Sequence, residues 1–108
     1  MHKYHQIRWI RFVPALFVVI GLPLTFHAVP PNGVYGLRTA ATLAFAETWY
    51  RANYFTGIAA VILGLGGVLC NLLVDRMPSL TLDQKMWTIV PTPVVVAFGM
   101  TAVGLAAI

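Results

Sequence analysis

Two stretches without a charged side chain, residues 54–74 and 87–108, set the strongest limit on how this chain can fold. Each has the length of about 20 apolar residues that an α-helix needs to cross a bilayer. The second stretch contains Pro91 and Pro93, and proline is best tolerated in the first turn of a helix. We therefore expect two membrane-spanning helices, the second of which becomes regular only near Pro93 and is short.

The composition of the whole chain also points to lipid as its surroundings. Of its 108 residues, 59% are hydrophobic and 9% are charged, against roughly 25% charged residues in a soluble domain. A soluble chain of this length would expose large apolar patches to water. The net charge of +4 comes from scattered basic residues, which argues against nucleic acid as a partner. Cys70 is the only cysteine, and we expect it to be a small buried apolar side chain.

A third apolar stretch, residues 9–26, follows the basic sequence MHKYHQIRWIR. Signal peptides share this pattern, but the first tolerable cleavage sequence, LAFA ending at Ala46, lies too far downstream. We interpret the stretch as a spanning helix that Pro14 and Pro23 kink or end. Residues 1–108 are thus expected to form a single all-α membrane domain with three transmembrane helices.

The distribution of basic residues between the loops predicts the orientation of the chain. Basic residues are more frequent before the first apolar stretch and between the last two than in the connection 27–53: Lys3, Arg8, Arg11, Arg76 and Lys85 against Arg38 and Arg51. Because lysine and arginine favour the cytoplasmic side, we expect a cytoplasmic N-terminus and an external C-terminus. The charged residues Asp75, Arg76, Asp83 and Lys85 are expected to form a solvated cytoplasmic loop.

The external connection, residues 27–53, contains the turn signal Pro-Pro-Asn-Gly and then changes to helix-forming residues. Thr42 can cap a helix N-terminus, and Glu47 stands four residues before Arg51, in the favourable order for an ion pair. We predict an amphipathic external helix that starts at Thr42 and either continues into the next span or bends near Gly57.

Small and polar residues share one face of this helix and of the span that follows. The members of this packing face are Thr42, Ala46, Trp49, Asn53, Gly57, Ala60, Gly64, Gly67 and Asn71. Glu47 and Arg51 lie on the opposite side at helical spacing. Because small residues let helices approach closely, we expect a packing seam within the chain, with an interface to another copy or to a partner as the alternative.

The sequence PNGVYGLRTAATLAFAETWYRANYFTG, residues 31–57, resembles the signature of the SdpI/YfhL family of small bacterial membrane proteins. The resemblance continues to about residue 74, and the other two apolar stretches match only as apolar helices. The matching positions are Asn32, Gly36, Arg38, Thr39, Thr42, Leu43, Trp49, Asn53 and Gly57.

The resemblance implies a function as well as a fold. The best-known family member is longer and protects a bacterium against a secreted toxin peptide, while relaying a signal to a repressor. The resemblance therefore implies a non-catalytic immunity or envelope-stress protein of the bacterial inner membrane, with a toxin peptide as partner. The alternative is a small structural subunit of a larger membrane complex. Three spans with glycine-rich faces make an incomplete bundle, which needs copies of itself or a larger partner.

The motif residues of the connection have three possible roles. Asn32 and Arg38 could hydrogen-bond the carbonyls of a buried turn, while Gly36 adopts a positive φ and Thr39 or Thr42 caps the next helix. Arg38 could instead reach lipid headgroups. It could also form, with Asn32 and Thr39, an external site for an anion or a peptide carboxylate. We favour the first of these roles.

The sequence offers little support for catalysis, metals or cofactors. His2, His5 and His27 have no cysteine or carboxylate at ligand spacing. The sequence LGLGG at residues 63–67 lies in an apolar stretch and lacks the strand and lysine of a nucleotide-binding loop. No nucleophile, base and orienting acid share one side of the membrane, and no carboxylate lies in the middle of a span, which argues against proton-coupled transport.

Overall fold

The computed structural model describes residues 8–32 and 35–108, and in this part of the chain all regular secondary structure is helical. The predicted all-α class is therefore confirmed, while His2, Lys3 and His5 lie outside the described residues. The helices are η1 (Arg8–Phe12), α2 (Ala15–Thr25), α3 (Ala40–Ala44), α4 (Ala46–Asp75), α5 (Leu82–Ile89) and α6 (Thr92–Ala106).

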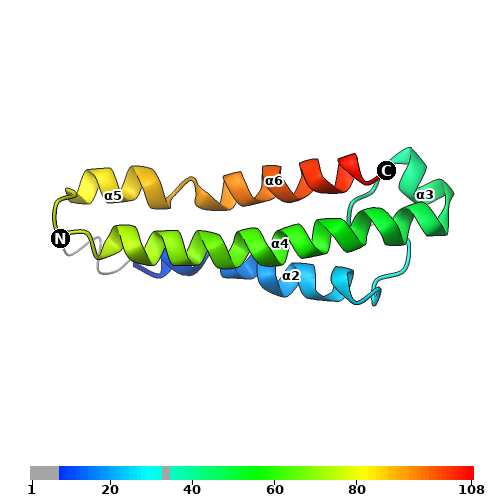
Figure 1. Cartoon of the computed structure of the whole chain (residues 1–108), viewed down its shortest axis with the longest axis horizontal. Coiled ribbons are helices and arrows are strands. Elements are labelled where there is room, and N and C mark those ends of the chain that lie inside the picture. The colour runs from blue at the N-terminus through cyan, green and yellow to red at the C-terminus, as the bar shows by residue number, and fades with distance from the viewer. Residues whose placement is uncertain (1–7, 33–34) are drawn as a thin grey trace.

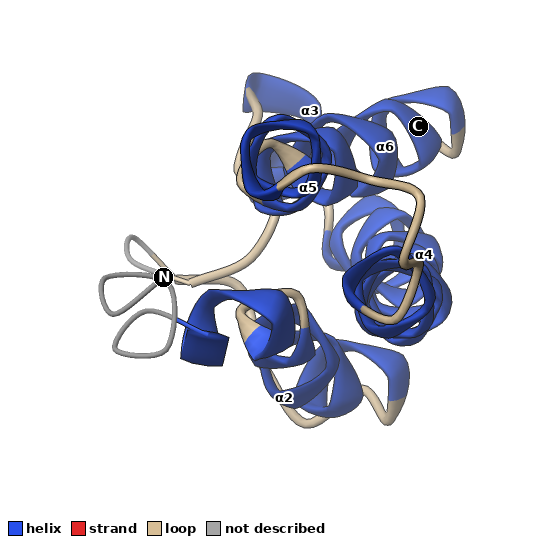
Figure 2. Cartoon of the chain, turned by 90° about the vertical axis from the view of Figure 1, so that its left-hand side faces the viewer, coloured by secondary structure: helices blue, strands red, loops and turns tan. Residues whose placement is uncertain are grey.

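The long helix α4 forms the centre of an elongated bundle that measures 51 × 22 × 19 Å (Figure 1). Helices α2 and α6 both pack along α4, and they make hardly any contact with each other (Figure 2). The short helix α3 lies at the end of the bundle where α4 begins. The bundle is therefore long enough to cross a hydrocarbon core of about 30 Å.

Two helical segments are long and apolar enough to cross a membrane, Ala46–Asp75 with 30 residues and Leu82–Ala106 with 25. The second segment comprises α5 and α6, which Val90 and Pro91 separate. A regular helix does begin close to Pro93, because a proline in the first turn loses no helical hydrogen bond. The segment is longer than predicted, because α5 precedes it almost without interruption.

The first apolar segment is shorter than predicted. Pro14 separates η1 from α2, because proline has no N–H to donate and its ring crowds the preceding turn. The apolar helical stretch Trp9–Thr25 is thus below the length of about 20 residues that is typical of a span. Pro23 lies inside α2, two residues before the helix ends at Thr25. That this segment crosses the membrane stays a prediction.

The predicted helix from Thr42 into the next span is interrupted at Phe45. Phe45 is extended, with φ −133° and ψ 124°, and separates α3 from α4. Thr39 caps α3, and Thr42 is the third helical residue of a capping box, so the prediction that the helix begins with Thr42 as its cap is wrong. Helix α4 continues through Gly57 without ending there.

The predicted ion pair between Glu47 and Arg51 does not form. The Arg51 Nε atom instead donates to the carbonyl of Ala107 at 2.9 Å, and its Nη2 atom donates to the Ile108 carbonyl at 3.3 Å. These carbonyls follow the last turn of α6, where a cation stabilises the negative end of the helix dipole. Arg51 thus connects the N-terminal part of α4 to the end of α6.

Glycines bring the backbones of α2 and α4 into direct contact. A Cβ atom on Gly21 would lie 2.6 Å from the Gly57 carbonyl oxygen, and a Cβ atom on Gly57 would lie equally close to the Gly21 oxygen. A Cβ atom on Gly64 would lie 2.7 Å from the Pro14 oxygen. Any larger residue at these positions would push the two helices apart.

Most of the packing face is buried within the chain. Its buried members on α4 are Trp49, Asn53, Gly57, Ala60, Gly64 and Asn71. Thr42 is buried too, but it lies in α3 beyond the break at Phe45, Ala46 is exposed, and Gly67 is partly buried. Cys70 is exposed, contrary to the prediction, because it lies about 100° around α4 from the buried Asn71.

Candidate functional site

Two buried side chains of α4 bind the backbone of the α2–α3 loop, residues 26–39. The Trp49 indole N–H donates to the Val29 carbonyl at 2.8 Å. The Leu37 N–H donates to Asn53 Oδ1 at 2.6 Å, and Asn53 Nδ2 donates to the Leu37 carbonyl at 3.3 Å. Trp49 and Asn53 are 0% and 2% exposed. The described residues of the loop itself are partly to fully exposed, so these two buried side chains are what attach its backbone to α4.

Asn32 closes the turn within this loop. Its Oδ1 atom accepts from the Tyr35 N–H at 2.7 Å, while its Nδ2 atom donates to the carbonyls of Pro30 at 2.8 Å and Tyr35 at 3.0 Å. The turn therefore uses the side chain both as donor and as acceptor. An ionised aspartate could only accept, so the amide is required for this arrangement.

Gly36 occupies a position that no other residue can fill without strain. Its φ is +107°, in a region that residues with a Cβ atom rarely adopt. An added Cβ atom would lie 2.8 Å from Asn53 Oδ1 and 3.1 Å from the Trp49 ring. Backbone conformation and lack of space thus both require glycine beside the two α4 side chains.

Thr39 and Thr42 connect the end of the loop to α3. The Thr42 hydroxyl accepts from the Thr39 N–H at 2.7 Å and donates to the Leu37 carbonyl at 3.0 Å. Thr39 Oγ1 in turn accepts from the Thr42 N–H at 3.1 Å. Thr42 is fully buried, so its hydroxyl serves both the helix cap and the loop.

Arg38 and Leu43 are more exposed than the residues of this network. The Arg38 side chain is exposed although its neighbours Leu37 and Thr39 are partly buried, and Leu43 is 51% exposed. Of the nine predicted motif positions, the network brings together Asn32, Gly36, Thr39, Thr42, Trp49 and Asn53. Gly57 lies one turn beyond them, where α4 meets α2.

Tyr35 belongs to the same site, although sequence reasoning did not assign it. Its hydroxyl donates to the Ile20 carbonyl of α2, and burial raises the pKa of the Tyr35 phenol above its usual value of 10.0. The sequence feature that could have identified Tyr35 is its position between Asn32 and Gly36 at a predicted membrane boundary, where a tyrosine hydroxyl can hydrogen-bond backbone. Tyr35 attaches the α2–α3 loop to α2.

A cavity of about 240 Å³ lies beneath the α2–α3 loop. Residues of α2, α4 and α6 line it, together with residues of the α2–α3 loop. Its lining consists of Ile20, Leu24, Tyr35, Gly36, Leu37, Thr56, Met100 and Thr101. The loop motif therefore closes one end of a mostly apolar space between helices.

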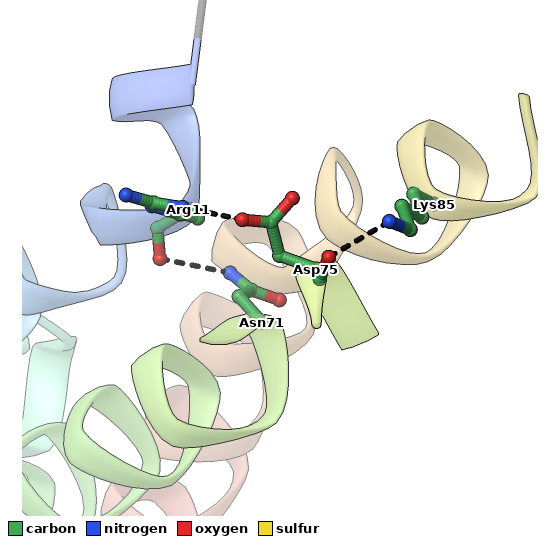
Figure 3. Close-up of polar contacts among 4 residues, drawn as sticks. All are labelled: Arg11, Asn71, Asp75 and Lys85. Carbon is green, nitrogen blue, oxygen red and sulfur yellow. Dashed lines mark hydrogen bonds and ion pairs between the residues drawn. The ribbon is translucent and has the colours of Figure 1, made fainter. Parts of the chain in front are cut away.

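A second polar cluster lies at the opposite end of the bundle (Figure 3). Arg11 of η1 forms an ion pair with Asp75 at the end of α4. Asn71 Nδ2 donates to the Arg11 carbonyl at 3.1 Å and to Thr92 Oγ1 at 2.9 Å, and Lys85 Nζ donates to the Asp75 carbonyl at 2.7 Å. The cluster thus joins η1, α4, α5 and α6.

The prediction of a solvated loop is therefore wrong for Asp75 and Lys85. The Asp75 side chain is only 8% exposed, and Lys85 lies in α5 beside the end of α4. Arg76 and Asp83 are exposed, as predicted. The sequence signal was a pair of opposite charges at the ends of apolar stretches that antiparallel packing brings together.

The described residues contain no group of three or more histidine, cysteine, aspartate or glutamate side chains that could hold a metal ion. The His27 ring stacks on Tyr54, with 5.4 Å between ring centroids. His27 has a φ of +58°, and the next N–H, of Ala28, donates to the Pro23 carbonyl at 2.9 Å. His27 therefore belongs to the C-terminal cap of α2.

Comparison with protein families gives a match to the model of the SdpI/YfhL protein family over residues 28–104. The chain belongs to the SdpI/YfhL family. The match reaches further than the predicted range, residues 31–74, and includes α5 and most of α6. The comparisons with curated proteins and with solved structures gave no match.

In this SdpI-family protein the motif forms one connected site. Asn32 shapes the turn, Gly36 allows the chain to pass Trp49, and Asn53 pairs with the backbone of Leu37. The arrangement can fix the position of a loop at the end of a helical bundle. Such a fixed loop presents its exposed side chains in a defined geometry, as a binding surface requires.

Proposed function

We propose that this SdpI-family protein is a non-catalytic immunity or envelope-stress protein that intercepts a secreted toxin peptide at the outer leaflet of the bacterial inner membrane. The observation that carries the proposal is the exposed Arg38 on a loop that Asn53, Trp49 and Asn32 hold by its backbone. A guanidinium with five donors suits a peptide carboxylate or another anion. The Arg38 side chain would contact the peptide, and the buried residues would position it.

The proposed orientation places the α2–α3 loop outside and the cluster of Arg11 and Lys85 in the cytoplasm. Both residues lie at the end of the bundle where α4 ends. Arg38 and Arg51 belong to the segments around the start of α4, at the other end. The end that holds Arg11 and Lys85 carries more basic residues than the other end, which supports a cytoplasmic location for that end. In this orientation η1 and α2 together make the first of three crossings.

A toxin challenge of cells that express the protein tests the proposal. Arg38→Ala should lose most of the protection while the protein remains in the membrane at its usual level. The matched control is Arg76→Ala, since Arg76 is exposed at the opposite end and should retain protection. Full protection by Arg38→Ala would show that Arg38 does not contact the toxin.

The alternative function, a small subunit of a larger membrane complex, gives a different result in a native mass measurement after gentle detergent extraction. Unlike subunits in a fixed ratio would support the accessory role and make the α2–α3 loop a structural element. A single chain, or copies of it alone, would support the immunity role.

A further inference from the structure

One asparagine of the chain stands before a glycine. The three asparagines are Asn32, Asn53 and Asn71, and the residues that follow them are Gly33, Tyr54 and Leu72. Gly33 lies outside the described residues. The peptide nitrogen that follows an asparagine can attack the side-chain amide carbon, and a side chain on the following residue hinders this attack. Because glycine has no Cβ atom, the sequence makes Asn32 the most reactive of the three amides.

The surroundings of the three asparagines favour the same residue. Asn53 and Asn71 are 2% and 0% exposed and lie inside α4, where the backbone N–H of the next residue donates to a carbonyl of the helix. Asn32 lies in the α2–α3 loop and is partly exposed. Water, which the loss of an amide consumes, therefore has access to Asn32 but not to the two helical asparagines.

The folded turn holds the Asn32 amide in one orientation. Its Oδ1 atom accepts from the Tyr35 N–H, and its Nδ2 atom donates to the carbonyls of Pro30 and Tyr35. An amide that is bonded through both atoms cannot rotate freely to present its carbon to a neighbouring nitrogen. We therefore expect the reaction rate to follow the population of molecules in which the turn has opened.

The loop is attached to two helices close to this turn. Asn53 of α4 pairs with the N–H and the carbonyl of Leu37, and the Tyr35 hydroxyl donates to the Ile20 carbonyl of α2. Tyr35 is also the residue whose N–H and carbonyl bind the Asn32 amide. Loss of either attachment should therefore make the turn open more often.

We propose that Asn32 is a site of spontaneous deamidation, and that the attachment of the α2–α3 loop to α4 and α2 keeps the reaction slow. The Gly33 nitrogen forms a bond to Asn32 Cγ, the bond between Cγ and Nδ2 breaks, and the proton of the Gly33 N–H leaves with the amide as ammonia. Water then opens the cyclic imide. Attack at Cγ gives aspartate, and attack at the main-chain carbonyl gives isoaspartate. The net reaction consumes water and releases ammonia.

Either product would break the turn. An ionised carboxylate only accepts hydrogen bonds, so the carbonyls of Pro30 and Tyr35 lose their donor. Isoaspartate also adds a carbon atom to the main chain. Because Arg38 lies in the same loop, deamidation should end the interception of a toxin peptide, a consequence that rests on the proposed function.

Deamidation rates of the full chain in detergent micelles test the proposal. Samples incubated in mildly alkaline buffer are digested, and mass spectrometry measures aspartate and isoaspartate at position 32. We expect Asn32 to deamidate about tenfold faster in Asn53→Leu than in the wild type, and about threefold faster in Tyr35→Phe. Glu47→Leu, at an exposed position of α4, is the matched control and should keep the wild-type rate. Asn71 should keep its amide in every protein.

The wild type unfolded in denaturant gives the rate of a fully open turn, and circular dichroism shows which variants keep their helices. If Asn53→Leu does not fold, Tyr35→Phe, which removes a single hydroxyl, decides the outcome. Equal rates in the folded wild type and in a folded attachment variant would overturn the proposal. A folded wild type that reacts as fast as the unfolded chain would overturn it too.

These rates do not depend on protection against a toxin, so deamidation and the proposed function can fail separately. Asn32→Asp, which carries one product of the reaction, should lose most of the protection in the toxin challenge. Full protection by this variant would count against the role of the loop in interception, whereas the measured rates alone decide whether Asn32 is a deamidation site.

Discussion

Asn53 and Leu37 pair across 16 residues much as two strands pair, except that one partner is a side chain. The Leu37 N–H donates to Asn53 Oδ1 at 2.6 Å and Asn53 Nδ2 donates to the Leu37 carbonyl at 3.3 Å. Asn53 also donates to the Trp49 carbonyl of its own helix at 3.0 Å. This pairing connects the α2–α3 loop to α4 and therefore fixes the position of Arg38.

Replacement of Asn53 should release the loop. Asn53→Leu has a similar volume but leaves the Leu37 N–H without its partner, while the Leu37 carbonyl keeps only the Thr42 hydroxyl. An unpaired buried donor costs about 1–3 kcal/mol. We expect a lower free energy of unfolding, measured by denaturation in detergent micelles, and faster proteolysis within the loop. Glu47→Leu, at an exposed position of the same helix, is the control and should change neither. An unchanged loop in Asn53→Leu would contradict the structural role of Asn53.

Two glycine-to-alanine changes should have opposite effects. Gly36→Ala places a Cβ atom against Asn53 Oδ1 at a φ of +107°, and the left-handed conformation alone costs roughly 1–2 kcal/mol. Gly66→Ala, within α4, meets nothing within 4 Å and should gain about 0.5–1 kcal/mol from helix propensity. Thermal midpoints of the two variants in the same detergent measure the difference. Equal midpoints would show that Gly36 is not under conformational constraint.

The ion pair between Arg11 and Asp75 should show strong coupling in a double-mutant cycle. Removal of one partner from a buried pair costs about 3–5 kcal/mol. Because Arg11 is 19% exposed, we expect Arg11→Met to lower the free energy of unfolding by about 3 kcal/mol or less. The double variant Arg11→Met, Asp75→Leu should lose less stability than the two single changes added together. Arg76→Met, next to Asp75 but exposed, is the control. Additive losses would mean that the two charges act independently.

Tyr35 should make the stability of the protein depend on alkaline pH. Because its pKa is raised in the folded state, the unfolded chain loses this proton at lower pH than the folded chain does. The stabilisation is therefore fully present below the usual pKa of 10.0 and is lost as pH rises through the folded pKa. The difference in thermal midpoint between the wild type and Tyr35→Phe, measured at several pH values, should shrink above pH 10. A constant difference would contradict the prediction.

The sequence by itself determined the all-α class, the two long apolar segments and most of the face by which α4 packs. These features depend on hydrophobicity and helical spacing, which are local properties of the chain. Gly57, Ala60 and Gly64 lie on one side of an α-helix whatever that helix packs against. The turn at Asn32 could likewise be predicted, because asparagine bonds its own nearby backbone.

Only the tertiary structure decided where α3 ends and which polar groups meet. Phe45 is extended although its neighbours favour helix, and the break lets Thr42 and Asn53 reach the same Leu37 carbonyl from two helices. Asp75 reads as a loop residue in the sequence, yet antiparallel packing brings it to Arg11, 64 positions away. Hydrogen bonds and ion pairs between distant segments depend on how helices are placed in space, and local sequence patterns do not by themselves specify which groups that placement brings together.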